Sequence, residues 1–254
     1  MSVQKEFAEI ARSDGRAALV TAMSGPHAGE RMLVNVDGST SGTLGDPELD
    51  AEGRTHAEEL MWSEKSEMRG DLFVDICAPP LRLIIFGAVE YADHLSRIAR
   101  ASGWRSYVVD PRGRFATKER FPEADEVIAA WPEKAFEQIG PPDPATFIAV
   151  LTHDPKLDDA VLFIALDSDA AYIGAMGAKK TQKARRERLL AAGVSEEDLA
   201  RISAPIGLDL GGKSTQETAL SIMAEVAAVR HGRDGGRMSQ KKKGDDRIHA
   251  GASK

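Results

Sequence analysis

The sequence predicts an α/β fold, a doubly wound parallel sheet preceded by a small α+β N-terminal module. An apolar run over residues 81–86 ends at Gly87, a helical pattern follows to Gly103, and a second apolar run over 106–109 ends in Asp110. This strand–turn–helix–strand unit of about thirty residues is typical of a right-handed crossover between parallel strands. Both runs are continuously apolar, as strands buried on both faces are. Similar alternation continues downstream, so we predict a Rossmann-like domain.

The first turn only partly matches a dinucleotide-binding fingerprint. Asp110 lies about twenty residues beyond Gly87, where such folds keep a carboxylate for ribose hydroxyls. The turn, however, reads Gly87-Ala88-Val89-Glu90, with valine in place of the second glycine. Glu90 favours the helix dipole but opposes an anionic ligand. The turn therefore indicates the fold more than it indicates bound NAD(P).

Composition excludes several classes of protein. The 254 residues carry a net charge of −7, which argues against a nucleic-acid binder. Cys77 is the single cysteine, so no intrachain disulfide can form, and we expect a buried thiol. The first sixteen residues lack the apolar core of a secretory signal, and no stretch reaches the roughly 18 apolar residues of a membrane span. We therefore predict a cytoplasmic protein without a membrane span.

The N-terminal module is predicted over residues 1–78. Its expected elements are helices over 3–12 and 56–62 and strands over 17–23, 31–37, 40–45 and 71–76. The pair Pro79-Pro80 interrupts the chain and marks the boundary.

The larger domain is predicted over residues 79–232. Beyond the first unit we expect strands over 126–129, 146–151 and 171–173, and helices over 132–139, 157–166, 179–192, 195–202 and 214–230. Ser195 with Asp198 and Ser214 with Glu217 have the spacing of capping boxes. The glycine- and lysine-rich residues 233–254 offer little to bury, so we predict a disordered basic tail.

Ligands of open α/β sheets bind beyond the carboxyl ends of the strands. The candidate binding residues at these ends are Gly87, Ala88, Asp110, Arg112, His153, Asp154, Gly174, Gly177, Lys179 and Lys180. Together they predict a binding site at one edge of the sheet, and the alternative is that they are ordinary caps and turns. Asp110 and Arg112 could grip a ribose or a heterocycle, or pair with each other.

The segment from Gly174 to Lys180 is the best candidate for a phosphate site. A glycine turn before a helix presents backbone amides, and Lys179 and Lys180 add positive charge. The cations further along the helix are predicted on a solvated face; they are Lys183, Arg185, Arg186 and Arg188.

Two other motifs each fit more than one role. His153-Asp154 fits an acid/base pair, a metal site or a helix cap, but no other histidine has ligand spacing, so no metal is predicted. Residues 207–214 fit the phosphate-loop pattern of nucleotide hydrolases. Pro205 interrupts the strand that should precede this loop, and too few residues follow for the rest of such a domain. No catalytic residue is predicted.

Several segments resemble the XdhC/CoxI family, the accessory proteins that mature xanthine dehydrogenase and related molybdenum hydroxylases. The matching segments include FGAVEYADHLSRIARASGW, VVDPRGRFATKERFPEADEV, VLTHDPKLDDAVLFIAL and YIGAMGAKKTQKARRERLLAAGV. They cover about residues 81–232 in order and spacing. A fainter likeness runs through GERMLVNVDGSTSGTLGDPELD in the N-terminal module.

The resemblance implies a cytoplasmic chaperone, and it favours non-catalytic insertion of a cofactor over enzymatic activity without deciding between them. It would bind molybdenum cofactor (molybdopterin), protect the sulfurated form and deliver it to an apo molybdenum hydroxylase of the xanthine dehydrogenase or CO dehydrogenase type. It also implies a homodimer, contact with a cysteine desulfurase, and a role for the strand-end residues in holding the cofactor. The alternatives are an NAD(P)-linked oxidoreductase on the same fold and an interaction module with a vestigial pocket.

The chain departs from the family pattern in three places. It has Ala178-Lys179-Lys180 where many members have Ser-Arg-Arg, and Gly87-Ala88-Val89-Glu90 where many have Gly-Ala-Gly-His. The turn Gly45-Asp46-Pro47 lacks the cysteine that many members carry there.

Overall fold

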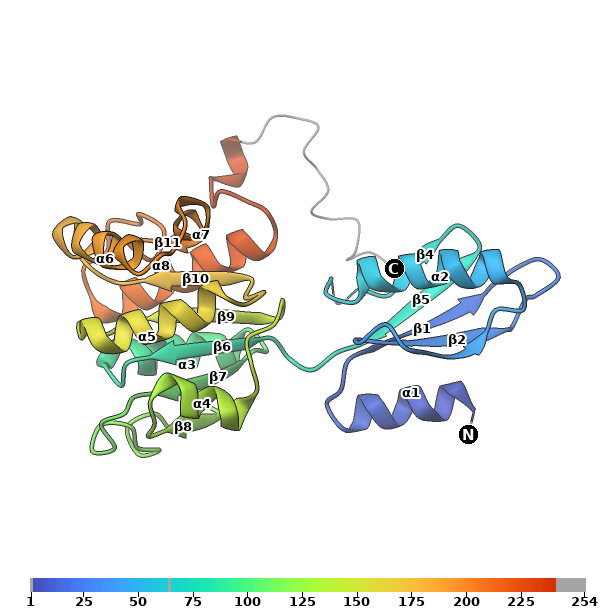
Figure 1. The fold of residues 1–254 in the computed structure, drawn as a ribbon, viewed down its shortest axis with the longest axis horizontal. Coiled ribbons are helices and arrows are strands. Elements are labelled where there is room, and N and C mark those ends of the chain that lie inside the picture. The colour runs from blue at the N-terminus through green and yellow to red at the C-terminus, as the bar shows by residue number, and fades with distance from the viewer. Residues whose placement is uncertain (1, 64, 241–254) are drawn as a thin grey trace. The chain divides into compact units, whose positions relative to one another are not determined.

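The computed structural model describes residues 2–63 and 65–240 (Figure 1). The chain divides into two compact units between Pro80 and Leu81. Each unit has its own sheet and its own hydrophobic core. None of the helices in the described part of the chain combines the length and apolarity needed to cross a bilayer.

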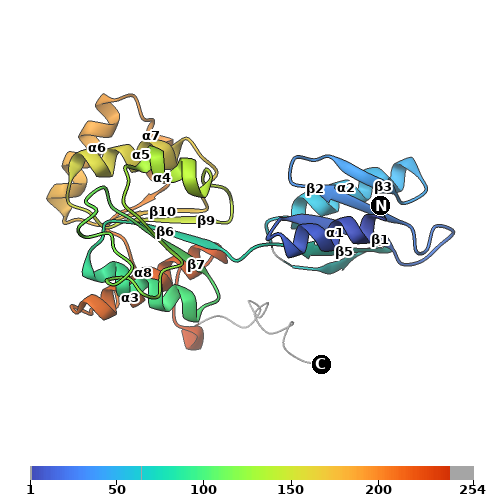
Figure 2. The ribbon, with the colours of Figure 1, turned by 90° about the horizontal axis from the view of Figure 1, so that it is seen from below.

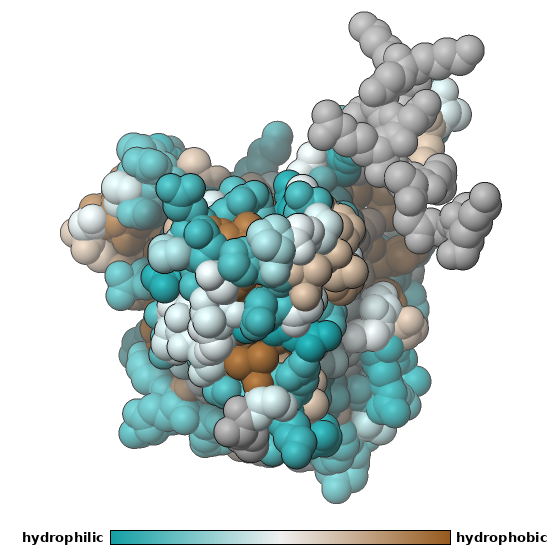
Figure 3. Space-filling view, turned by 90° about the vertical axis from the view of Figure 1, so that its right-hand side faces the viewer, coloured by the Kyte–Doolittle hydropathy of each residue, from teal (hydrophilic) through white to brown (hydrophobic). Residues whose placement is uncertain are grey.

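The first unit is a five-stranded antiparallel sheet with two helices. Its elements are α1 (Val3–Arg12), β1 (Ala17–Ala22), β2 (Arg31–Asn35), β3 (Thr40–Thr43), α2 (Pro47–Leu60), β4 (Glu67–Arg69) and β5 (Leu72–Cys77), with strand order β3-β2-β1-β5-β4. α1 and α2 lie on opposite faces of this sheet (Figure 1). The surface of this unit in Figure 3 is mainly hydrophilic, with small, scattered hydrophobic areas.

Helix α2 is longer than the predicted 56–62 segment. It begins nine residues earlier, at Pro47, because the Asp46 side chain accepts hydrogen bonds from the backbone amides of Glu48 (2.9 Å) and Leu49 (3.1 Å). Proline suits the first helical position, where its missing N–H would have no partner. Strand β4 was not predicted either.

The second unit is a six-stranded parallel sheet of order β11-β10-β9-β6-β7-β8. Its strands are β6 (Arg82–Phe86), β7 (Arg105–Val109), β8 (Glu126–Ile128), β9 (Thr146–Val150), β10 (Tyr172–Ala175) and β11 (Ile202–Ser203). Its helices are α3 (Glu90–Ala101), α4 (Pro132–Ile139), α5 (Pro155–Leu166), α6 (Lys179–Ala191), α7 (Glu196–Ala200) and α8 (Thr215–Arg230), followed by the 3₁₀ turn η1 (Met238–Gln240). This is the strand order of dinucleotide-binding folds, which reverses between β6 and β9. The predicted fold class is confirmed.

Helices cover both faces of the parallel sheet. α3 and α8 pack together on one face, and α4, α5 and α6 lie on the other (Figure 2). Between the layers the central strands are apolar and fully buried, for example Ile84 and Phe86 of β6 and Ile148 and Val150 of β9. This sandwich fixes the carboxyl ends of the strands, from which the candidate site is built.

The structure corrects the prediction near β10. Gly174, expected in a turn, lies inside the strand between Ala149 of β9 and Ser203 of β11. The helix predicted over 195–202 ends at Ala200, since the next residues extend the sheet as β11.

At the chain's C-terminal side, the capping box of Ser214 and Glu217 is confirmed. Of the tail predicted over 233–254, residues 241–254 lie outside the described residues, and the part before them contains η1.

Candidate functional site

A cavity of about 760 Å³ lies at the carboxyl ends of four strands of the second unit. Val89 follows β6, Pro111 and Arg112 follow β7, Trp131 follows β8, and His153 and Asp154 follow β9. The cavity therefore occupies the switch point between β6 and β9, where open α/β sheets bind their ligands. Its volume suits a ligand of cofactor size.

One wall of this switch-point cavity depends on Asp110. Its side chain is fully buried and accepts the backbone amide of Ala88 at 2.9 Å. It also forms a two-pronged ion pair with Arg112, through Nε at 2.9 Å and a terminal nitrogen at 2.7 Å. Burial alone raises the pKa of Asp110, but the hydrogen bonds from Arg112 and Ala88 outweigh it, and the pKa is lowered. The structure thus pairs Asp110 with Arg112.

Arg112 is the partner that reaches the cavity. Its side chain is 54% exposed, so part of the guanidinium faces solvent while the rest holds Asp110. Its pKa is raised, first by the hydrogen bonds to Asp110 and more weakly by the charge of Asp154. Asp110 is therefore an internal anchor, and Arg112 is the group that can meet an anion.

Gly87 lets the first turn pass close to β9. Its φ is +115°, in the region that favours glycine, and its amide donates to the carbonyl of Val109 at 2.8 Å. A Cβ there would lie 3.0 Å from Cγ2 of Thr152 and 3.3 Å from the carbonyl carbon of Leu151. The glycine thus joins three strand ends below the cavity.

His153 and Asp154 also line the cavity and are exposed. The Asp154 carboxylate caps α5 by accepting the amide of Lys156 at 2.9 Å, so the predicted cap is present. The His153 ring follows a buried strand end and is available to a ligand in the cavity. Among the described residues, no cluster of three metal-binding side chains is found.

Trp131 is a lining residue that the sequence did not predict. Its side chain is 46% exposed, unusual for the largest apolar side chain, and it lies between β8 and α4. The available signal was a tryptophan directly before the helix-opening Pro132. An exposed indole at a cavity offers a flat surface for a planar ligand.

The candidate phosphate residues lie at the end of β10, outside the cavity lining. Gly177 has a φ of +142° and packs against Thr181, and its carbonyl accepts from Nε2 of Gln182 at 3.0 Å. Lys179 and Lys180 are exposed, and neither forms an ion pair within the described residues. Of the ten predicted residues, Arg112, His153 and Asp154 line the cavity, and Gly87, Ala88 and Asp110 lie in the strand ends beside it. The other four, Gly174, Gly177, Lys179 and Lys180, belong to β10 and the segment that follows it.

Arg185 is buried, contrary to the prediction of a solvated helix face. It is 2% exposed and donates to Oδ2 of Asp158 at 2.7 Å and to the carbonyl of Met176 at 2.9 Å. The other oxygen of Asp158 accepts the hydroxyl of Thr152, which lines the switch-point cavity. A buried polar chain thus links the ends of β9 and β10.

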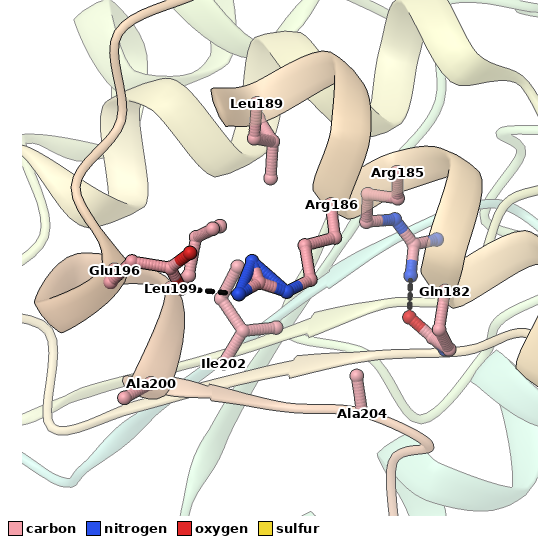
Figure 4. A pocket seen from close by; sticks show the side chains of 9 residues that line it. All are labelled: Gln182, Arg185, Arg186, Leu189, Glu196, Leu199, Ala200, Ile202 and Ala204. Carbon is pink, nitrogen blue, oxygen red and sulfur yellow. Dashed lines mark hydrogen bonds and ion pairs between the residues drawn. The ribbon is translucent and has the colours of Figure 1, made fainter. Parts of the chain in front are cut away.

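A second cavity, of about 310 Å³, lies between α6, α7 and β11 (Figure 4). Arg186 points from α6 toward Glu196 and forms an ion pair with it. Arg185 and Gln182, joined at 2.6 Å, form another part of the lining. The same arginine therefore belongs to the wall of this cavity and to the chain that ends at Thr152.

The segment over 207–214 lacks room for a nucleotide phosphate. One carboxylate oxygen of Glu217 accepts the backbone amides of Lys213 and Ser214, each at 3.2 Å, and the Ser214 hydroxyl at 2.8 Å. The carboxylate therefore occupies the place where a phosphate-loop amide nest would hold its anion.

Strand order and strand-end side chains define a Rossmann-like α/β domain with a cavity at its topological switch. A family model, the XdhC Rossmann domain, matches residues 83–226. The chain therefore belongs to the XdhC family, as its strand-end motifs predicted.

Curated relatives agree with this membership. The chain is 30% identical over 162 residues to a probable xanthine dehydrogenase subunit of Bacillus subtilis, covering 63% of this chain and 46% of that protein. It is 30% identical over 152 residues to the molybdenum cofactor insertion chaperone PaoD of Escherichia coli, covering 60% and 41%. The chain thus spans less than half the length of these relatives.

One solved structure shares the fold. A xanthine dehydrogenase from Bacillus halodurans superposes with a TM-score of 0.61 at 24% identity, covering 93% of this chain and 65% of that one.

Proposed function

We propose that this protein is an accessory factor that binds molybdenum cofactor at the switch-point cavity and passes it to an apo molybdenum hydroxylase. The observation that carries the proposal is the composition of that cavity in a chain of this family. Trp131 offers an aromatic face, Arg112 a guanidinium, and His153 and Asp154 further polar groups. A pterin is a planar heterocycle with hydrogen-bonding edges and an anionic end, so each type of group has a counterpart.

The same side chains would bind and orient the cofactor. The indole of Trp131 stacks on the ring system, and His153 and Asp154 hydrogen-bond its polar edge. Apolar Val89 and Leu157 exclude water from the bound ring. Because the cavity opens at the strand ends, a hydroxylase can receive the cofactor without unfolding of the domain. These residues bind and orient, and none of them is assigned a catalytic step.

Protection of a sulfurated cofactor rests on burial in this proposal. The turn at Gly45 has no thiol, and its glycine, with a φ of +90°, packs against His27. Cys77 ends β5, and burial raises the pKa of its thiol, which makes it a poor nucleophile. Cysteine desulfurase and a second copy of the chain remain proposed partners on the strength of the family alone.

Calorimetric titration of the full chain with molybdopterin, NADH and NADPH tests the proposal. We expect molybdopterin to bind, with weaker binding after Trp131→Ala or His153→Ala. Phe163→Ala is the matched control, because Phe163 is an aromatic residue 42% exposed on α5 and outside the cavity lining. Tight binding of a nicotinamide dinucleotide without binding of molybdopterin would refute the proposal. Loss of affinity in the Phe163 control equal to that of Trp131→Ala would also count against this site.

A further inference from the structure

Three arginines surround one aromatic ring beside the switch-point cavity. The guanidinium carbons of Arg114, Arg112 and Arg120 lie 4.5, 4.9 and 5.5 Å from the ring centroid of Phe115. All three belong to the segment between β7 and β8. We call these four residues the Phe115 cluster, and we propose that it is a phosphate-binding subsite.

The positive charge of the Phe115 cluster is poorly neutralised, although the chain as a whole carries −7. Asp110 is buried and held by Arg112 and the turn at Ala88. The Glu119 carboxylate keeps its charge, because hydrogen bonds from its own backbone amide and the Thr117 hydroxyl lower its pKa. Within the described residues, however, it forms no ion pair with an arginine of the cluster.

The remaining guanidiniums have no carboxylate of their own in the described part of the chain. Arg120 donates to the carbonyls of Ala88 (3.1 Å) and Phe115 (2.9 Å), and within the same residues Arg114 has only its ring contact. With Arg112 balanced by Asp110, the like charges of Arg114 and Arg120 on one ring still repel each other, and an added anion would relieve that repulsion. The ring fixes the guanidiniums in place, so less side-chain entropy is lost when the anion binds.

The position of the cluster matches its chemistry. It follows β7, the second strand of the domain, and Rossmann folds that accept a phosphorylated ribose place an arginine near this strand end. Arg112 belongs both to the cluster and to the lining of the cavity, so a ligand can reach the cluster from the cavity. Guanidiniums also match phosphate oxygens in a planar, two-pronged geometry that lysine lacks.

The cluster competes with the site predicted at Lys179 and Lys180. Those lysines follow β10 and do not line the cavity, whereas Arg112 does. The inference deepens the proposed cofactor binding and rests on it only for the ligand's identity. The shared chemistry is a phosphate ester or diphosphate, carried by molybdopterin or by NADP(H).

Titration of the full chain with inorganic pyrophosphate tests the cluster itself. We expect salt-sensitive binding that Arg114→Gln weakens roughly tenfold or more, the loss of one charged hydrogen bond. Arg114 is exposed, so its substitution should leave the melting temperature unchanged. Arg54→Gln, which removes a guanidinium from α2 of the first unit, is the control and should bind like the parent.

Any of three results would overturn the inference. The first is a parent chain that does not bind pyrophosphate, and the second is an Arg114→Gln variant with the parent's affinity. The third is loss of binding in a Lys179→Gln, Lys180→Gln double variant while Arg114→Gln still binds.

Titrating the Arg114→Gln variant with molybdopterin, NADPH and NADH as well distinguishes a failure of the subsite from a failure of the proposed function. If Arg114→Gln weakens both pyrophosphate and molybdopterin, the subsite serves the proposed cofactor. If it weakens pyrophosphate and NADPH but not NADH, and molybdopterin does not bind, the subsite stands while the proposed function fails.

Discussion

Gly87 is the residue where the turn after β6 comes closest to β9. Gly87→Ala would place a methyl group 3.0 Å from Thr152 in a backbone conformation that L-residues rarely adopt. We expect a loss of about 1–3 kcal/mol in the free energy of unfolding. Gly103→Ala is the matched control, because Gly103 also has a positive φ (+77°) but nothing lies within 4 Å of the place its Cβ would take. Equal losses in urea denaturation would show that the close approach carries no cost.

Asp110 should make stability depend on pH. Its pKa is lowered in the folded protein, so its contribution is fully present above the unfolded pKa of about 3.9 and is lost as pH falls through the folded value. Asp110→Asn should therefore destabilise the second unit near neutral pH, by on the order of 2 kcal/mol, and much less in acid. Thermal melts of parent and variant between pH 3 and 7 measure this.

The control for that measurement is Asp169→Asn, which removes an exposed carboxylate after α5. The melting temperature of this variant should follow that of the parent at every pH. An Asp110→Asn curve that is also parallel would mean that the ion pair with Arg112 adds nothing to folding.

Side-chain chemistry was predicted better than side-chain environment. Asp110 and His153 were correctly predicted to follow strands, because the end of a buried strand can be read from the place where an apolar run stops. Arg185 was misjudged, since a run of cations on a helix is usually solvated, and only the packing of α5 against α6 brings Asp158 to it. Nothing local to the sequence marks which cation of such a run is buried.

Helices α5 and α6 are joined by two ion pairs that differ in burial. The side chains of Asp158 and Arg185 are each 3% exposed, whereas those of Asp159 and Arg188 are 20% and 37% exposed. Asp158→Asn should cost about 3–5 kcal/mol, because it leaves the buried guanidinium without its counter-charge. Asp159→Asn, on the same helix, should cost less than about 1 kcal/mol. Urea denaturation of the two variants compares them directly, and equal costs would contradict this account.

The predicted bounds of helices and strands were wrong where tertiary contacts determine them. α2 includes Gly53, normally a sign that a helix ends, but a Cβ there would lie 2.7 Å from Cδ1 of Leu44. The glycine is therefore explained by close packing. β11 is two residues long and exists because it adds to the edge of β10, which a single segment cannot reveal. Strong local signals did succeed, as at the Ser214 capping box.

The second unit carries all of the candidate binding residues. Its core and its cavity are formed from residues after Pro80. We therefore expect a fragment of residues 81–240 to unfold cooperatively on its own and to bind pyrophosphate within a few-fold of the full chain. Circular dichroism melts and calorimetry test both points. A fragment that is unfolded, or folded but unable to bind, would show that the first unit contributes to the site.

The sequence predicts a parallel sheet in the second unit, but it does not predict the order of the six strands. Repeated strand–helix units predict a parallel sheet, and handedness limits the choices, but the position of each new strand depends on which face its helix covers. The order β3-β2-β1-β5-β4 of the first unit was beyond reach for a related reason, since β4 carries no apolar run.

Trp131 gives this protein an optical property. Of its three tryptophans, Trp104 is 8% exposed and packs against Phe147, with ring centroids 4.6 Å apart and the rings tilted by 48°. Trp62 packs against the core of the first unit. Trp131, 46% exposed, should therefore contribute the longest-wavelength part of the intrinsic fluorescence. A heterocycle stacked on its indole would quench that emission and shift the remainder to the blue. Trp131→Phe should abolish the response, so occupancy of the cavity can be followed without any added label.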